Sequence, residues 1–196
     1  MVGIQKIAGS LCQGDIYKDI RIIEDILDYD GKTEYRFIEF PYVVVVSQAC
    51  DLDQNYKQRE MWRLYNENKE ENKKPSNMDK FLLSIMVLPM YNYKHFIEGS
   101  HLSGLDLEMQ KLQMSETKWS NSNYVKNEVP RYHYMEFPRE AGIPNSIIDF
   151  KHYFTCSYEY LYNARFDDRY VATIDILYRE LLSQRFCNYL GRIGLP

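Results

Sequence analysis

Four consecutive valines, Val43 to Val46, constrain the fold of this chain more than any other feature of its sequence. Successive side chains of a strand point to opposite faces, so a half-exposed strand would leave two of these valines in water. The run therefore predicts a strand that is covered on both faces. Directly after it come polar and reactive side chains, held at the rim of a rigid element, where we expect a functional site: Ser47, Gln48, Cys50 and Asp51.

Length and charge exclude several classes of protein. The 196 residues suffice for one domain with its own core, and we interpret residues 53–80 and 92–128 as insertions into it. A formal net charge of −4 disfavours a general nucleic-acid coat protein but leaves a local basic groove open. No apolar stretch approaches about 18 residues and Met1 to Gln13 lacks a signal-peptide core, so we predict a cytoplasmic protein without a membrane span. The 18 tyrosines leave a homodimer open.

The cysteines and histidines predict neither a metal site nor a cofactor. The four cysteines contain no C-x-x-C pair, so we expect reduced, mostly buried thiols: Cys12, Cys50, Cys156 and Cys187. His95 and His101 lack cysteines or clustered carboxylates at ligand spacing, which favours ordinary surface histidines. The glycines also lack the spacing of a phosphate-binding loop.

The first half of the chain predicts strands around the valine run. A strand is expected over residues 14–24 and a return strand over 33–46, joined through an Asp-Gly turn at 29–31. Pro41 lies inside the return strand, where we expect a bulge, an edge position or a break.

The remaining elements are expected in the following order. Residues 53–80 are expected to form a solvated insertion with a short helix at 58–65 and a mobile run at 66–74. A buried strand is expected over 81–88 and stops at Pro89. After it we expect a helix at 104–118, strands at 131–135 and 146–156, and a C-terminal helix at 171–190. Together they predict a mainly β fold with helices, namely a small, partly closed antiparallel barrel of about five strands with the last helix packed on it.

Three short motifs resemble the MazF/PemK-like toxins of bacterial toxin–antitoxin systems. They are Gly14-Asp15-Ile16, then Phe40-Pro41 through the valines to Ser47, then a strand ending at Val87 to Tyr91. Members of that family open with Gly-Asp-Ile or Gly-Asp-Leu, continue to Arg-Pro-x-Val-Val-x-Ser and reach a strand ending in Pro-x-Thr. Residues 150–161 and 171–189 are similar to the family's last strand and closing helix. The resemblance implies an SH3-like barrel.

The resemblance also raises a question about chemistry. In that family the arginine before the proline and the threonine at the strand end are associated with cleavage of single-stranded RNA, but this chain has Phe40 and Tyr91 there. RNA cleavage needs a base, a proton donor and a cation, and phenylalanine supplies none of them. The family's ribonuclease chemistry is therefore expected to be absent or rebuilt from other residues.

Three functions remain open. The first is a binding module of a bacterial or phage toxin–antitoxin-like or defence-like system, which binds a protein partner or single-stranded RNA through the rim around Ser47, Asp51 and Arg131. Arg131 to Tyr134 joins a cation, a titratable ring and aromatic side chains, the groups that grip single-stranded nucleic acid. Further candidate binding residues are Gln48, Tyr91, Tyr132 and Tyr134.

The other two functions are enzymatic. One is a metal-independent endoribonuclease with a rebuilt site that uses Arg131, His133 and Asp51. The other is a hydrolase with Cys50 as nucleophile and His133 as its base, oriented by Asp51 or Asp149. The alternatives without catalysis are a structural thiol at Cys50 and an ordinary alternating strand around His133.

Overall fold

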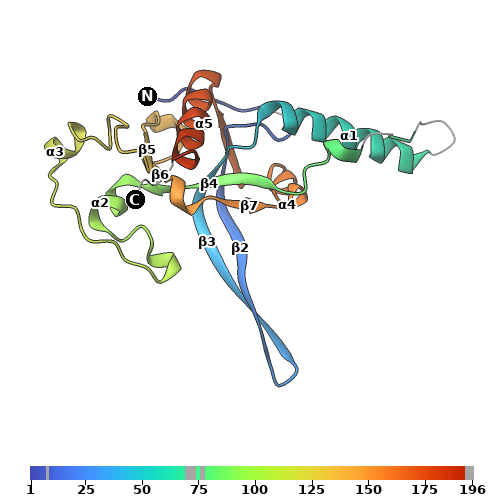
Figure 1. Cartoon of the computed structure of the whole chain (residues 1–196), viewed down its shortest axis with the longest axis horizontal. Helices are drawn as coiled ribbons and strands as arrows, with labels where there is room; N and C mark the ends of the chain where they lie inside the picture. Colours follow the sequence, from blue (N-terminus) through green and yellow to red (C-terminus); the bar gives the residue numbers. More distant parts are fainter. Residues whose placement is uncertain (8, 69–73, 76–77, 193–196) are drawn as a thin grey trace.

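The centre of the protein is one curled antiparallel sheet with helices around it (Figure 1). The computed structural model describes residues 1–7, 9–68, 74–75 and 78–192. The strands are β1 (Ile4–Gln5), β2 (Asp15–Tyr29), β3 (Lys32–Val45), β4 (Ile85–Asn92), β5 (Tyr132–Met135), β6 (Ser146–Asp149), β7 (Phe154–Cys156) and β8 (Tyr170–Ile174). They follow the order β1, β8, β2, β3, β4, β6, β5, with β7 also paired to β4.

The helices are α1 (Ala49–Glu67), α2 (Tyr93–Glu98), α3 (Glu116–Ser120), α4 (Tyr158–Ala164) and α5 (Ile176–Leu190). Short 3₁₀ turns occur at Met78–Lys80, Ser103–Leu105, Arg139–Ala141 and Phe150–His152. The predicted β fold with helices, built on a partly closed antiparallel sheet, is confirmed. About five strands was too low a number, because strands as short as β1 and β7 carry too few residues to show alternation.

The valine run forms the middle of the sheet, as predicted. β3 pairs with β2 on one side and with β4 on the other. Val44 and Val46 belong to one apolar core, together with Leu182 and Phe186 of α5. The intervening valines, Val43 and Val45, belong to a second core that includes Leu52 of α1 and Leu161 of α4. Both faces of the run are therefore covered, each by different helices.

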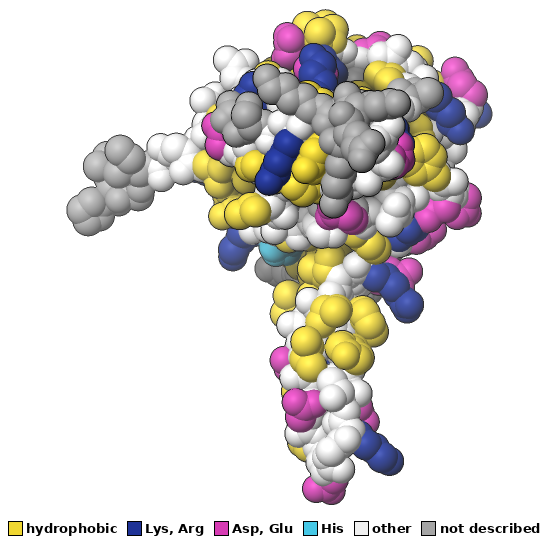
Figure 2. Space-filling model, turned by 90° about the vertical axis from the view of Figure 1, so that its right-hand side faces the viewer, with side chains coloured by type: hydrophobic (Ala, Val, Ile, Leu, Met, Phe, Trp, Pro, Cys, Tyr) yellow, Lys and Arg dark blue, Asp and Glu magenta, His cyan; other side chains and the backbone are white. Residues whose placement is uncertain are grey.

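Strands β2 and β3 continue beyond the body as a long arm (Figures 1 and 2). The predicted Asp-Gly turn is confirmed, with positive φ at Asp30 (48°) and Gly31 (75°), but β2 ends at Tyr29 rather than at Glu24. Pro41 neither ends nor splits β3, but the β2–β3 ladder omits it together with the opposite Asp19, whose φ is 53°, and the register shift of this ladder lies between Ile23 and Asp25. Four apolar side chains of the arm are about half exposed: Ile23, Ile26, Tyr35 and Phe37.

Pro89 does not stop the fourth strand. It lies inside β4 opposite Val43, and the strand begins at Ile85 rather than at Phe81. On the other side of β4, the ladder to β7 ends at Val87 and the ladder to β6 begins at Met90. Pro89 lies in the gap between these two ladders, where a residue without an N–H is tolerated.

The helix predicted over residues 104–118 is wrong, since only α3 and the turn at Ser103–Leu105 are helical there. Parts of the backbone of this segment bond to α2 and to the residue that follows it. Met109 N donates to Gly99 O at 3.0 Å, and Leu112 N donates to Ile97 O at 2.8 Å. A non-local pairing of this kind overrides a ragged local periodicity.

Three further boundaries differ from the prediction. Strand 146–156 is split into β6 and β7, because the Asp149 side chain accepts a hydrogen bond from Lys151 N at 3.0 Å and turns the chain. The last helix starts at Ile176, since Tyr170–Ile174 forms strand β8 beside β2. The short helix predicted at 58–65 is part of the longer α1, and most of the mobile run predicted after it lies outside the described residues.

All four cysteines are free, but the prediction that they are mostly buried is wrong. Cys156 is buried and Cys12 is partly buried, whereas Cys50 and Cys187 are exposed on the outer faces of α1 and α5. In the described part of the chain, no helix combines the length and apolar character needed to cross a membrane.

Candidate functional site

The polar rim after the valine run forms the start of α1. Ser47 Oγ accepts a hydrogen bond from Met86 N at 2.8 Å, which ties the end of β3 to β4. Gln48 is the N-cap residue of α1, although its side chain makes no capping bond. Cys50 and Asp51 are exposed in the first turn, where an acidic side chain suits the helix dipole. The end of β3 and the first turn of α1 therefore explain the positions of these four residues.

His133 lies apart from this rim. It is on β5 at the far edge of the sheet, while α1 projects from the opposite side of the molecule (Figure 1). Its side chain is 3% exposed, its ring stacks near Phe150, and its Nδ1 has no hydrogen-bond partner. Burial, together with Arg185, lowers the pKa of His133 to about 3. The structure does not bring His133 together with Cys50 or Asp51.

Of the predicted strand residues, Arg131 is the one in a polar cluster. Its guanidinium binds the Asp149 carboxylate with two bonds: Nε to Oδ1 at 2.8 Å and Nη2 to Oδ2 at 2.6 Å. The pairing of β5 with β6 sets Tyr132 opposite Asp149 and so places the two groups side by side. Asp149 is fully buried, whereas the Arg131 side chain is 33% exposed. Tyr132 and Tyr134 pack instead among the aromatic rings of α2 and α3.

His152 completes one side of this cluster. The 3₁₀ turn after β6 places its Nδ1 3.4 Å from Asp149 Oδ2 and 3.5 Å from the hydroxyl of Tyr91. Burial lowers the pKa of His152, which favours a neutral ring at neutral pH. We assign the Nδ1 proton to the side of Asp149, which leaves Nε2 with a free lone pair. Neither His152 nor its contact with Tyr91 was predicted from the sequence.

His101 lies on the other side of Tyr91. Its ring centre is 5.1 Å from that of Tyr91, its residue exposure is 9%, and neither ring nitrogen has a hydrogen-bond partner. Burial lowers the pKa of His101 to about 4, and Asp149, His152 and Arg131 are close enough to influence it. The interpretation of His101 as a surface histidine is therefore wrong. We call these five residues the Asp149 cluster: Tyr91, His101, Arg131, Asp149 and His152.

A hollow of about 220 Å³ opens beside the Asp149 cluster. Tyr91 and His101 line it together with Pro41 and His95. The two positions that the family resemblance singles out thus differ in their surroundings: Tyr91 lies in the cluster, whereas the Phe40 ring stacks on Phe154 at 4.4 Å in the second core. Phe40 is consequently a core residue.

The signals for this cluster were weak in the sequence. Asp149 and His152 have the i, i+3 spacing of a short turn, which could have indicated a pair at the end of a strand. Nothing in the sequence linked His101 to them. Among the residues that the structure describes, no three His, Cys, Asp or Glu side chains form a group that could hold a metal ion. Comparison with protein-family models, curated proteins and solved structures gives no match.

Proposed function

We propose that this chain is an endoribonuclease that cleaves single-stranded RNA at the Asp149 cluster by acid–base chemistry without a metal ion. The observation that carries the proposal is the carboxylate of Asp149, which binds Arg131 and lies 3.4 Å from His152 Nδ1, while that nitrogen lies 3.5 Å from the hydroxyl of Tyr91. This reaction needs a base, a proton donor and a cation. In the proposed site these are His152, Tyr91 and Arg131.

The reaction can be written with every proton accounted for. His152 Nε2 takes the proton of the ribose 2′-hydroxyl, and the 2′-oxygen forms a bond to phosphorus while the bond from phosphorus to O5′ breaks. Tyr91 gives its proton to O5′ and recovers one from His152 Nδ1. The products are a 2′,3′-cyclic phosphate and a 5′-hydroxyl, and the enzyme regains its starting protonation as the other ring tautomer.

Arg131 has the part of the cation in this scheme. Its Nε and Nη2 are held by Asp149, while its Nη1 has no partner among the described residues and its side chain reaches solvent. A fixed cation at this position stabilises the charge that develops on the phosphorane oxygens. It would replace the arginine that the MazF/PemK-like toxins have at the position of Phe40.

The family resemblance supports the same proposal. Pro41 and Tyr91, which belong to the second and third motifs, line one hollow although 50 positions separate them in sequence. We therefore place the activity in a toxin–antitoxin-like or defence-like system that acts in the cytoplasm. The Cys50 hydrolase lacks comparable support, because the hydrogen-bond partners of Cys50 Sγ are Gln48 and Asp51 and no histidine is among them.

The test is cleavage of a mixed single-stranded RNA pool by the purified protein in the presence of EDTA. Wild type should give fragments with cyclic phosphate ends, and His152→Ala should lower the rate by about 10²–10⁴ with an unchanged melting temperature. Cys50→Ala, an exposed change outside the cluster, is the control and should cleave like wild type. Absence of cleavage by wild type would refute the proposal and leave a binding module.

A further inference from the structure

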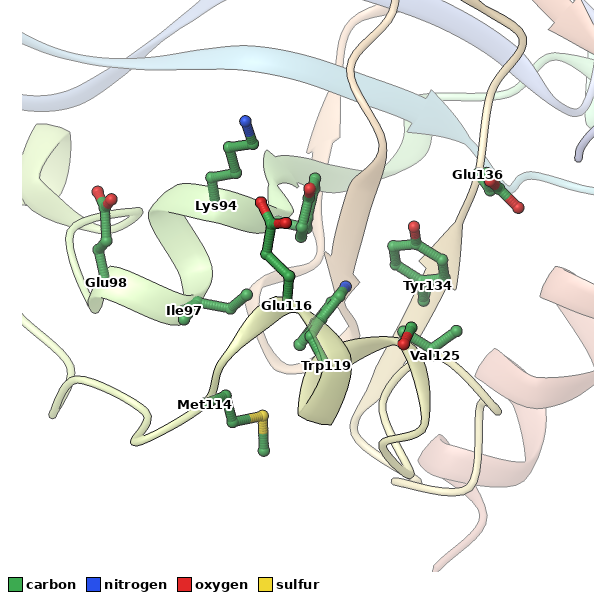
Figure 3. Close-up of a pocket in the computed structure, with 11 residues that line it drawn as sticks. Lys94, Ile97, Glu98, Met114, Glu116, Trp119, Val125, Tyr134 and Glu136 are labelled. Atoms are coloured by element: carbon green, nitrogen blue, oxygen red, sulfur yellow. The ribbon is translucent and has the colours of Figure 1, made fainter.

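A larger hollow of about 620 Å³ lies between α2, α3 and β5 (Figure 3). This volume is within the range of small-molecule sites. The residues that matter for its chemistry are Tyr93, Lys94, Glu116, Trp119 and Tyr134. Figure 3 shows Glu116, Trp119 and Tyr134 around a common space, with Lys94 at its edge.

The wall of this hollow has polar groups without well-formed hydrogen bonds. Trp119 is 4% exposed, and its Nε1 has no hydrogen bond of good geometry, although the Tyr134 side chain is near enough to interact with it. Its ring is fixed between Tyr93, stacked at 5.5 Å, and Tyr124, stacked at 5.8 Å. Glu116 is exposed in the first turn of α3 and has no ion pair or hydrogen bond among the described residues. A buried indole N–H usually has a well-formed hydrogen bond, so the N–H of Trp119 keeps the capacity to donate to a ligand in the hollow.

The hollow connects with the Asp149 cluster through shared walls. It shares Tyr93 and Lys94 with a neighbouring hollow of about 500 Å³, which also contains Arg139. That second hollow shares Asn92 and Pro144 with the hollow beside Tyr91 and His101. Lys94 and Arg139 are both exposed, and no ion pair holds either of them in the described part of the chain. Lys94 and Arg139 therefore lie along the series of neighbouring hollows between the Asp149 cluster and Trp119.

We propose that the hollow at Trp119 is a pocket for a guanine base of the RNA strand, whose phosphates pass Lys94 and Arg139. Guanine offers an acceptor, O6, for the N–H of Trp119, and two adjacent N–H groups on its Watson–Crick edge that a carboxylate such as Glu116 can accept together. Glu98 and Glu136 at the ends of the hollow repel phosphate and so favour a base there. This inference names the substrate specificity of the proposed ribonuclease and rests on that function.

Base binding can be measured without any cleavage. The chain has two tryptophans, so Trp62→Phe leaves Trp119 as the only one, and its fluorescence reports on the pocket. We expect guanosine monophosphate to quench it with a Kd at least about tenfold lower than adenosine, cytidine or uridine monophosphate. Glu116→Gln should raise that Kd about tenfold or more, whereas Glu108→Gln, an exposed change of the same segment outside the hollow, should leave it unchanged.

Equal quenching by all four nucleotides, or no quenching by any of them, would overturn the guanine pocket. Quenching by the polyamine spermidine but by no nucleotide would overturn it too, because the hollow would then bind a cation and not a base. Mapping of cleavage sites separates this result from the proposed function. Cleavage at a fixed distance from guanine in the wild type, with that guanine preference weakened in Glu116→Gln, supports both proposals. Guanosine binding without any RNA cleavage refutes the ribonuclease and keeps the pocket. Cleavage without guanosine binding or a guanine preference refutes only the pocket.

Discussion

Two buried aspartates of this protein each bind an arginine, yet their surroundings differ. Asp15 and Arg165 form an ion pair in which the side-chain exposures are 0% and 3%. Asp15 also accepts hydrogen bonds from Thr173 Oγ1 at 2.5 Å and from Cys12 N at 2.8 Å. The Arg165 guanidinium lies over the ring of Tyr170 at 4.3 Å and donates to Ile7 O. This pair is closed to solvent, although Arg165 Nε has no hydrogen-bond partner, and it ties the N-terminal segment to β2 and β8.

The Asp149 pair is open by comparison. Arg131 is one-third exposed, and His152 Nδ1 lies 3.4 Å from Asp149 Oδ2 and 3.5 Å from the Tyr91 hydroxyl, both longer than good hydrogen bonds. A hollow lined by Tyr91 and His101 lies beside the Asp149 cluster. The difference teaches that a buried ion pair alone does not indicate function. What distinguishes a candidate site is incomplete pairing next to accessible space.

Breaking the closed pair should have the largest effect. Asp15→Asn leaves the Arg165 charge buried without compensation, so we expect the free energy of unfolding to fall by about 3–5 kcal/mol in a urea titration. Asp168→Asn is the control, because Asp168 pairs with Lys18 at the surface and is 88% exposed. The control should cost less than about 1 kcal/mol. Equal losses in the two variants would contradict the view that the buried Asp15 pair matters more for stability than a surface pair.

The open pair should respond in activity more than in stability. Arg131→Gln removes the cation and should lower RNA cleavage by about 10²–10³, the usual effect of a lost electrostatic donor. Arg131→Lys keeps a charge but not the two-bonded fork, so it should recover only part of the rate. Steady-state cleavage and thermal melting would be measured on both variants. A variant that loses stability and activity in parallel would indicate a structural pair like that of Asp15.

The buried histidines make stability depend on pH. The folded-state pKa of His133 is about 3, below its unfolded value of about 6.5, so its stabilising contribution is complete above pH 6.5 and is lost as pH falls toward 3. Each such histidine contributes a slope of about 1.4 kcal/mol per pH unit within that window. His133→Leu should flatten the dependence of the unfolding free energy on pH, measured between pH 6 and pH 4. An unchanged slope would show that His133 titrates normally.

Cysteine labelling should give the smallest and most local signal. Burial and the Asp15 charge raise the pKa of Cys12, so iodoacetamide at neutral pH should label it at least about tenfold more slowly than the exposed Cys50. Asp15→Asn should accelerate labelling of Cys12 and leave that of Cys50 unchanged. Mass spectrometry of the peptides gives both rates in one sample. Equal rates at Cys12 and Cys50 in wild type would mean that the closed pair does not shield Cys12.

The sequence predicted the elements that depend on neighbours along the chain. Val43 to Val46 required cover on both faces, the Asp30-Gly31 turn followed from the need for positive φ, and the alternation at 131–135 gave β5. Arg131 and Tyr91 were named as candidate site residues, and both belong to the Asp149 cluster. Each of these inferences uses only the geometry of a strand or a turn.

Contacts across the sheet decided the rest. The β5–β6 register places Arg131 beside Asp149. The chain turn at Asp149 brings His152 back toward the Asp149 carboxylate. The segment around His101 packs on Tyr91 and Phe96. The same kind of contact overrode the helix predicted at 104–118, whose backbone bonds to α2 and Gly99. Local patterns fix strands and turns because their energies are local, whereas a site assembled from four segments depends on pairings that only the folded chain determines.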